Sequence, residues 1–216
     1  TIAHVMGLAI FDEMMKKHQH ALYCGNSLAI AEVASTFVED FVLEEVANQA
    51  GEEHKLAILM MKLNDDITTI FRQVAAYRFE QELHAAFREK GYLSKTEIGA
   101  LFQKNMAAYM GPAVTQDPGA ENWWVYWSHF RRFFYVYSYA SGLLISKALQ
   151  NKVRKDKKFM TNVKEFLSAG SSDSPKNIFM NLGIDIADVT FWQSGLAEVE
   201  NLLTEAKTLA KKLGKI

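Results

Sequence analysis

The chain has 216 residues, of which 49% are apolar and 23% charged, and its formal net charge is −1. This composition suits a globular protein with a full core, and the balanced charge gives no bulk attraction to nucleic acid or to a membrane surface. The single cysteine, Cys24, excludes an internal disulfide framework and fits a reducing cytoplasm, where we expect the protein to reside. No apolar run approaches the roughly 20 residues of a membrane-spanning helix, and no basic region precedes the apolar N-terminal residues as in a signal peptide.

Helical periodicity dominates the sequence, and runs rich in Val, Ile and Thr are few. We therefore expect an all-α fold of about eight or nine helices, in a single domain over residues 1–216. In chain order, the first three predicted helices cover residues 2–22, 27–49 and 52–90, and a fourth begins at residue 95. The next helix follows the aromatic tract at 123–139 and ends at residue 155. Of the last three, one covers 156–169, one begins at residue 175, and one covers 190–214.

Several helix ends carry sequence signals of their own. Gly91 is a predicted C-terminal cap, because glycine adopts the left-handed conformation at little cost. Ser94 and Glu97 have the spacing of a capping box, which predicts a helix start directly after Ser94. Pro175 follows Ser174 at a predicted first turn, where the missing N–H of proline is harmless.

The stretch that begins at Thr1 resembles the zinc-peptidase pattern T-x-x-H-E-x-G-H-A, with two of its functional residues replaced. In H-E-x-x-H, two histidines four residues apart share a helix face and bind one zinc ion, and the glutamate is the general base toward the zinc-bound water. Here His4 occupies the first ligand position, Val5 replaces the glutamate, and Leu8 replaces the second histidine. Glu32, within A-E-V-A-S-T, stands where zinc sites of this kind take a third ligand.

Further segments make the chain similar to the oligoendopeptidase F family, within the thimet-oligopeptidase group of zinc metallopeptidases. One of them contains H-F followed by F-Y-V-Y-S-Y-A-S-G. The segments that carry the resemblance are residues 23–36, 71–82, 91–94, 127–142, 166–170 and 182–185. The resemblance implies that the chain corresponds to the C-terminal catalytic lobe of such a peptidase, with the N-terminal half of the family absent.

The resemblance also implies an activity, which is zinc-dependent hydrolysis of short peptides. In that reading, His4 and Glu32 are the remaining zinc-ligand positions. A typical catalytic zinc site uses three protein ligands and one open position. Two ligands are too few, so we expect zinc by family resemblance but none bound to this sequence.

The same resemblance assigns a role to the aromatic tract. His129, Tyr137 and Tyr139 match side chains that, in the family, donate hydrogen bonds to the substrate carbonyl as it becomes an oxyanion, and Tyr135 is a further candidate. In a regular helix Tyr135 and Tyr139 share a face and Tyr137 points elsewhere. An irregular turn after His129 would instead allow Tyr137 to enter the site with Tyr139.

Apolar residues occupy the helix face that carries His4. Leu8 and Phe11 lie four and seven residues after His4 on one stripe, and Val5 flanks it. Glu39 belongs to a polar stripe on the second helix that we expect to face inward. We therefore expect Val5, Leu8, Phe11 and Glu39 to line one cavity.

Three functions remain open for this sequence. The first is a former metallopeptidase without activity, because Val5 cannot accept a proton and Leu8 cannot bind a metal. In this case the zinc motif was lost either naturally or by engineering. The second is an engineered helical scaffold whose apolar cavity takes a small apolar ligand or an artificial substrate. The third is a non-enzymatic helical interaction module. Short peptides are the expected partners in the first case, no nucleic acid or membrane partner is expected, and the oligomeric state stays open.

Overall fold

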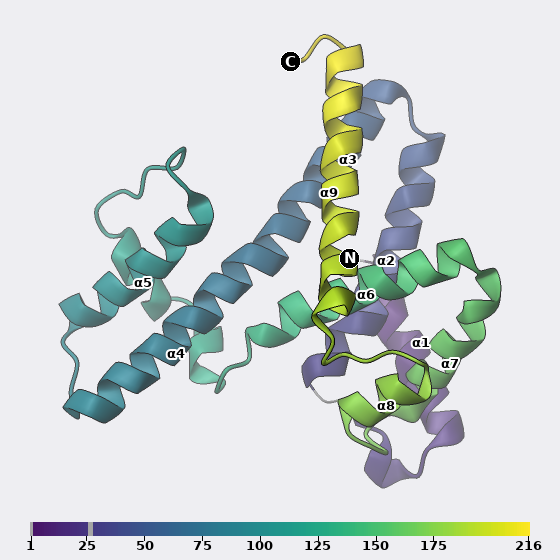
Figure 1. Cartoon of the computed structure of the whole chain (residues 1–216), viewed down its shortest axis with the longest axis horizontal. Helices are drawn as coiled ribbons and strands as arrows, with labels where there is room; N and C mark the ends of the chain where they lie inside the picture. Colours follow the sequence, from purple (N-terminus) through teal and green to yellow (C-terminus); the bar gives the residue numbers. More distant parts are fainter. Residues whose placement is uncertain (1, 26–27) are drawn as a thin grey trace. The chain divides into compact units, whose positions relative to one another are not determined.

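The computed structural model describes residues 2–25 and 28–216, and within them it contains nine α-helices, short 3₁₀ and π-helical turns, and no strand (Figure 1). The predicted all-α fold is therefore confirmed. The start predicted for the second helix, residue 27, lies outside the described residues. The α-helices are α1 (Ile2–His18), α2 (Leu28–Gln49), α3 (Glu52–Ile67), α4 (Gln73–Lys90), α5 (Lys95–Met110), α6 (Tyr137–Lys155), α7 (Met160–Ala169), α8 (Pro175–Asn181) and α9 (Val189–Lys212).

The chain folds into two compact units. The first unit comprises Thr1–Asp66 and Ser141–Ile216, and the second comprises Ile67–Ala140. The first unit thus holds α1, α2, α7, α8, α9 and nearly all of α3 and α6, while α4, α5 and the aromatic tract form the second. None of the helices in the described ranges is long and apolar enough to span a bilayer.

Aromatic side chains from three helices form the centre of the first core. Phe11 of α1 stacks on Phe166 of α7, with 6.2 Å between ring centroids, and Phe166 stacks on Phe179 of α8 at 5.0 Å. All three rings are almost completely buried. Full burial of one such ring contributes about 1.5–3 kcal/mol, so this stack is a major part of what holds α1 against α7.

Two glycines let helices of the first unit approach each other closely. A Cβ atom added to Gly7 of α1 would lie 2.6 Å from the backbone oxygen of Ala34 in α2. A Cβ atom on Gly195 of α9 would lie 2.7 Å from the backbone oxygen of Leu144 in α6. Both separations are too short for real atoms, so these two helix crossings require glycine.

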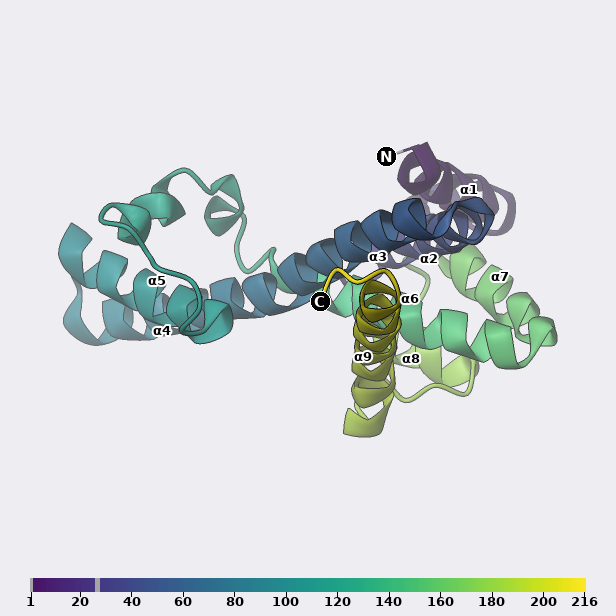
Figure 2. The same cartoon turned by 90° about the horizontal axis from the view of Figure 1, so that it is seen from above.

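Helix α9 crosses α3 at an angle within the first unit, as both views show (Figure 1 and Figure 2). Lys55 of α3 pairs with Glu205 of α9 at 2.8 Å, and Lys212 of α9 pairs with Glu52 at the start of α3. Such partly exposed pairs contribute about 0–1 kcal/mol each, so they define the register of the two helices more than they stabilise them.

The second unit has its own apolar core between α4, α5 and the aromatic tract. The ring of Phe79, fully buried in α4, packs edge-on against Phe102 of α5 at 5.2 Å and against Phe130 of the tract at 5.1 Å. The two helices are joined by a short connection. Gly91 caps α4 in the left-handed conformation, with φ of 72°, and the predicted Ser94–Glu97 capping box is present at the start of α5.

Two predicted helix boundaries differ from the structure. The segment 52–90 is helical throughout, but a π-helical turn at Thr68–Arg72 divides it into α3 and α4. Such turns are rare and occur mostly as single-turn insertions inside α-helices, so the sequence predicts a continuous helical segment. The first helix ends at His18, and a separate 3₁₀ turn covers Ala21–Tyr23.

Candidate functional site

His4 lies in the first turns of α1, on the side that faces α2. The close approach at Gly7 brings this turn against α2, and the Nδ1 atom of His4 lies 3.1 Å from Oε2 of Glu39. Both side chains are about one-third exposed. Histidines that bind metals commonly bond a carboxylate through their second ring nitrogen. The pair with Glu39 therefore occupies Nδ1 and leaves Nε2 as the atom that a ligand could meet.

Glu32 lies on α2 near the same histidine. A Cβ atom on Gly142 of α6 would lie 2.5 Å from the Cβ of Glu32, so α6 passes directly over this position. Burial raises the pKa of the Glu32 carboxyl, and the nearby His4 opposes that rise. His4, Glu32 and Glu39 thus lie where α1 meets α2.

The apolar residues expected beside His4 differ in their exposure to solvent. Val5 is 55% exposed and Leu8 36% exposed, so both lie at the surface of the first unit. Phe11 is 0% exposed and lies inside the core on Phe166. Neither Val5 nor Leu8 carries a donor atom. Among the residues that the structure describes, no three His, Cys, Asp or Glu side chains are placed to share a metal ion.

An apolar groove opens further along the same helices, where α1, α2 and α7 meet. Its volume is about 490 Å³. Its lining includes Ile10, Met14, Phe37, Phe41, Val163 and Leu167. The lining atoms are almost all carbon, with Glu45 and Lys164 contributing the charged groups. The groove has the size of a small-molecule site.

In the second unit, His129, Tyr135 and Tyr139 form one cluster of rings. The Nε2 atom of His129 lies 3.0 Å from the Tyr139 hydroxyl, and ring centroids in the cluster are 5.4–5.6 Å apart. The Nδ1 atom of His129 is buried and has no hydrogen-bond partner. Burial, followed by the positive charge of Arg132, lowers the pKa of His129. The imidazole is therefore biased toward its neutral form, which can both accept and donate a hydrogen bond.

The segment between His129 and the tyrosines is irregular. The 3₁₀ turn Ser128–Arg131 ends there, and α6 begins only at Tyr137. Tyr137, at the start of α6, packs against Tyr77 of α4 at 6.3 Å. An irregular turn after His129 is thus present, but the structure gathers Tyr135 with Tyr139 around His129 and gives Tyr137 a different ring neighbour.

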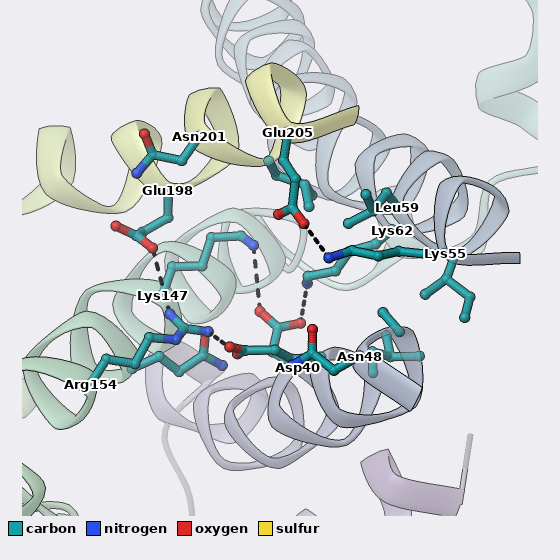
Figure 3. Close-up of a pocket in the computed structure, with 16 residues that line it drawn as sticks. Asp40, Asn48, Lys55, Leu59, Lys62, Lys147, Arg154, Glu198, Asn201 and Glu205 are labelled. Atoms are coloured by element: carbon teal, nitrogen blue, oxygen red, sulfur yellow. Dashed lines mark hydrogen bonds and ion pairs between the residues drawn. The ribbon is translucent and has the colours of Figure 1, made fainter. Parts of the chain in front are cut away.

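A polar pocket of about 290 Å³ lies between α2, α3, α6 and α9 of the first unit (Figure 3). At its base Asp40 pairs with Lys62 and, at 3.4 Å, with Lys147. At its rim Arg154 pairs with Glu44 at 2.7 Å. Further members of the rim are Lys55, Glu198 and Glu205. Each charged group at the base and rim has an opposite partner, which indicates a structural ion-pair network.

The base of this pocket is formed by four charged side chains that are largely buried. Lys147 is 3% exposed and lies 2.7 Å from Asp66, which is equally buried. Burial disfavours the charge of Asp40, but Lys147 and Lys62 together outweigh burial and lower its pKa. Burial raises the pKa of Asp66 against the same two lysines. The group is held by mutual pairing, and no member can be removed without leaving an unpaired charge.

Sequence reasoning did not identify Gly7, Glu80 or Lys147 as important. The one sequence signal for Lys147 is its place in the largely apolar stretch from Leu143 to Leu149, where a solvent-exposed lysine would not be expected. Gly7 has its signal in the x-G-x of the zinc-peptidase pattern, where it permits the α1–α2 approach. Glu80, completely buried in α4, has no local signal at all.

Known proteins resemble this chain along almost its full length. The sequence profile of Peptidase family M3 matches residues 1–198. Oligoendopeptidase F (chromosomal) of Lactococcus lactis subsp. cremoris is 27% identical over 98% of this chain and 36% of its own length. Oligopeptidase PepF of Bacillus subtilis (strain 168) is 29% identical over 96% of this chain and 32% of its own length. The chain thus spans about a third of the length of the curated relatives it matches.

Solved structures agree with this relationship. A protein of Chlamydophila abortus, described as a candidate peptidase, has a TM-score of 0.87 and 27% identity over 96% of this chain and 35% of that one. Oligoendopeptidase-F from Enterococcus faecium shares the fold, with a TM-score of 0.76 over 96% of this chain and 38% of that one. The similarity to oligoendopeptidase F inferred from the sequence is confirmed. The chain belongs to peptidase family M3.

Proposed function

We propose that this chain has the fold of the catalytic lobe of a zinc peptidase for short peptides but has lost the zinc motif, and that it does not hydrolyse peptides as written. The observation that carries the proposal is the donor set at the α1–α2 contact. His4 keeps its Glu39 partner at 3.1 Å and Glu32 lies nearby, whereas Val5 and Leu8 offer no base and no second imidazole. When bound in the relatives' kind of site, zinc would supply Lewis acidity toward a peptide carbonyl, and two donors are too few to hold it.

The ring cluster of the second unit supports descent from a peptidase. The Tyr139 hydroxyl and His129 form a preorganised hydrogen-bonded pair at 3.0 Å. Donors of this kind stabilise an oxyanion, and loss of one typically lowers kcat by about 10²–10³. We assign this role to His129 and Tyr139, with Tyr135 packed beside them and Tyr137 as the alternative donor. In this chain the pair has no metal-activated nucleophile to assist.

The test is hydrolysis of a fluorogenic peptide by three forms of the chain. These are the chain as written, the Val5→Glu/Leu8→His variant (the restored variant), and Val5→Glu/Ala9→His, which adds the same residue types with the imidazole on the wrong helix face. We expect zinc-dependent hydrolysis from the restored variant only. It will be slow, because the relatives' other two thirds have no counterpart in these 216 residues. Zinc-dependent hydrolysis by the chain as written overturns the proposal.

A second candidate function is binding of a small apolar molecule. The groove of about 490 Å³ between α1, α2 and α7 favours it, since apolar clefts of several hundred Å³ are common ligand sites. Titration with a hydrophobic fluorescent dye tests this function, with Phe41→Asp as the variant that should abolish saturable binding. Unsaturable binding, or binding unaffected by that substitution, favours instead a helical interaction module.

A further inference from the structure

Two consecutive phenylalanines in the aromatic tract have left-handed backbone conformations. Phe133 has φ of 29° and Phe134 has φ of 55°. Within the described residues, every other positive φ belongs to glycine. Bulky residues in this region are strained and persist only where surrounding contacts impose the conformation. The turn leads directly into Tyr135, which packs on His129 at 5.4 Å.

One face of α4 supplies contacts that hold this turn. Tyr77 packs edge-on against the ring of Phe134 at 5.6 Å. His84 packs against Phe134 at 5.1 Å and against Phe133 at 6.3 Å. Positions 77, 80 and 84 are spaced by three and four residues, so they share one helix face. Glu80 therefore lies on this face between Tyr77 and His84, whose rings contact the turn.

The carboxylate of Glu80 is buried at this contact. The residue is 1% exposed, and neither carboxylate oxygen has a well-formed hydrogen bond. The group that favours its charged form is the backbone N–H of Phe134, in the strained turn itself. A buried carboxylate without a salt-bridge partner is costly. Glu80 shares the face of α4 whose Tyr77 and His84 rings contact Phe134 in the turn.

We infer that Glu80 is a positioning residue, whose carboxylate attracts the Phe134 amide and so holds the left-handed turn that places Tyr135 and Tyr139 against His129. Its meaning for catalysis rests on the proposed role of His129 and Tyr139. The tests below observe the turn itself, so this inference and the proposed function can fail independently.

The ionisation of Glu80 makes the arrangement sensitive to pH. Burial raises the pKa of Glu80 to about 7, and the Phe134 amide opposes that rise. On α4 the titratable neighbours are Tyr77 and His84. Arg132 precedes the turn with its guanidinium 5.6 Å from the Tyr135 ring, and on α5 the charge of Lys104 is paired with Glu82 at 3.0 Å. Protonation removes the anionic acceptor, so the turn loosens as pH falls through this range.

The direct test uses the unaltered chain. The ¹³C resonance of the Glu80 carboxyl, the ¹⁵N–¹H resonance of Phe134 and the ring resonances of Tyr135 and Tyr139 are followed from pH 5 to pH 9. We expect all of them to show a step with one common midpoint near 7. A Glu80 step that the Phe134 amide and the two rings do not share overturns the inference, as does a midpoint near the ordinary carboxyl value.

A matched pair of variants on α4 supplies the second test. Glu80→Gln keeps the shape but removes the charge, while Glu89→Gln makes the same change at an exposed position of the same helix. We expect the shared step in the tyrosine rings to vanish in Glu80→Gln and to persist in Glu89→Gln, with the separate step of His129 present in both. A step retained in Glu80→Gln contradicts the inference. If Glu80→Gln does not fold, the titration of the unaltered chain still decides.

Discussion

His4 in α1 and Glu39 in α2 meet at 3.1 Å between Nδ1 and Oε2, although 35 residues separate them in the chain. This contact fixes which ring nitrogen of His4 remains available. The pairing of an imidazole with a carboxylate is the support that metal-binding histidines ordinarily have. The structure thus keeps this support for the histidine that we propose as a former zinc ligand, whereas Val5 and Leu8 offer neither a proton acceptor nor a metal-binding group.

Glu39 should matter for metal binding once the motif is restored. In the restored variant, Glu39→Gln is expected to weaken zinc binding by about 10–100-fold, the usual effect of losing such a supporting carboxylate. Glu45→Gln, at an exposed position of the same helix, should leave the affinity unchanged. Isothermal titration of the metal-free variants with zinc measures both. Equal affinities for the two substitutions would show that the His4–Glu39 contact has no supporting role.

Gly7→Ala should destabilise the first unit. The added Cβ atom would lie 2.6 Å from the Ala34 oxygen, which is backbone and cannot move aside without shifting α2. Overpacking of this kind costs about 1–3 kcal/mol. The control is Gly51→Ala, where an added Cβ meets nothing within 4 Å. Urea denaturation followed by circular dichroism gives both free energies of unfolding, and a harmless Gly7→Ala would disprove the close approach of α1 to α2.

Asp40→Asn should be among the most damaging single changes in the chain. It removes the carboxylate that pairs with Lys62 and Lys147, and Lys147 is then left with Asp66 alone. Breaking a buried ion pair by removing one partner costs about 3–5 kcal/mol. The exposed Lys16–Glu13 pair is the comparison, because Glu13→Gln should cost about 0–1 kcal/mol. The two losses in the free energy of unfolding, measured at pH 7, should differ clearly. If both losses are small and similar, the ion-pair network is not buried from solvent.

The stability of the protein should fall with rising pH in a window set by Glu80. Its pKa is raised in the folded state from 4.5 to about 7. Between these values the folded protein retains a proton that the unfolded chain has released, so the free energy of unfolding decreases as pH rises. Above pH 7 both states are charged and this contribution becomes constant. Glu80→Gln removes the contribution.

The measurement is the free energy of unfolding of the unaltered chain and of Glu80→Gln between pH 4.5 and pH 8. The variant should gain stability relative to the unaltered chain across this window, with Glu89→Gln as the exposed control. The charged form thus costs overall stability while it holds the Phe134 turn. A difference that does not change with pH would refute the raised pKa.

Local signals were enough to predict much of the fold. The left-handed cap at Gly91 and the capping box of Ser94 with Glu97 depend on residues within a few positions of each other, and the structure has both. The division of the segment 52–90 was not predictable, since a π-helical turn at Thr68–Arg72 preserves the helical pattern on both sides. Boundaries that depend only on neighbouring residues are thus the ones the sequence reveals.

The candidate site was predictable only in part for the same reason. The meeting of His4 with the second helix follows from helix periodicity together with the family pattern. The turn at Phe133 and Phe134 contradicts the backbone preference of phenylalanine, so no local rule predicts it. Glu80 and Lys147 are buried by contacts with residues far along the chain, and their roles become visible only when those contacts are known.

The central claim is the loss of the zinc site, and the zinc content of the purified chain tests it most directly. Elemental analysis after dialysis against micromolar zinc is expected to find far less than one zinc ion per chain for the sequence as written. The restored variant, with His4 and the new histidine at position 8 four residues apart on one helix face and Glu32 nearby, should bind close to one. About one tightly held zinc ion per chain in the unaltered protein would contradict the account.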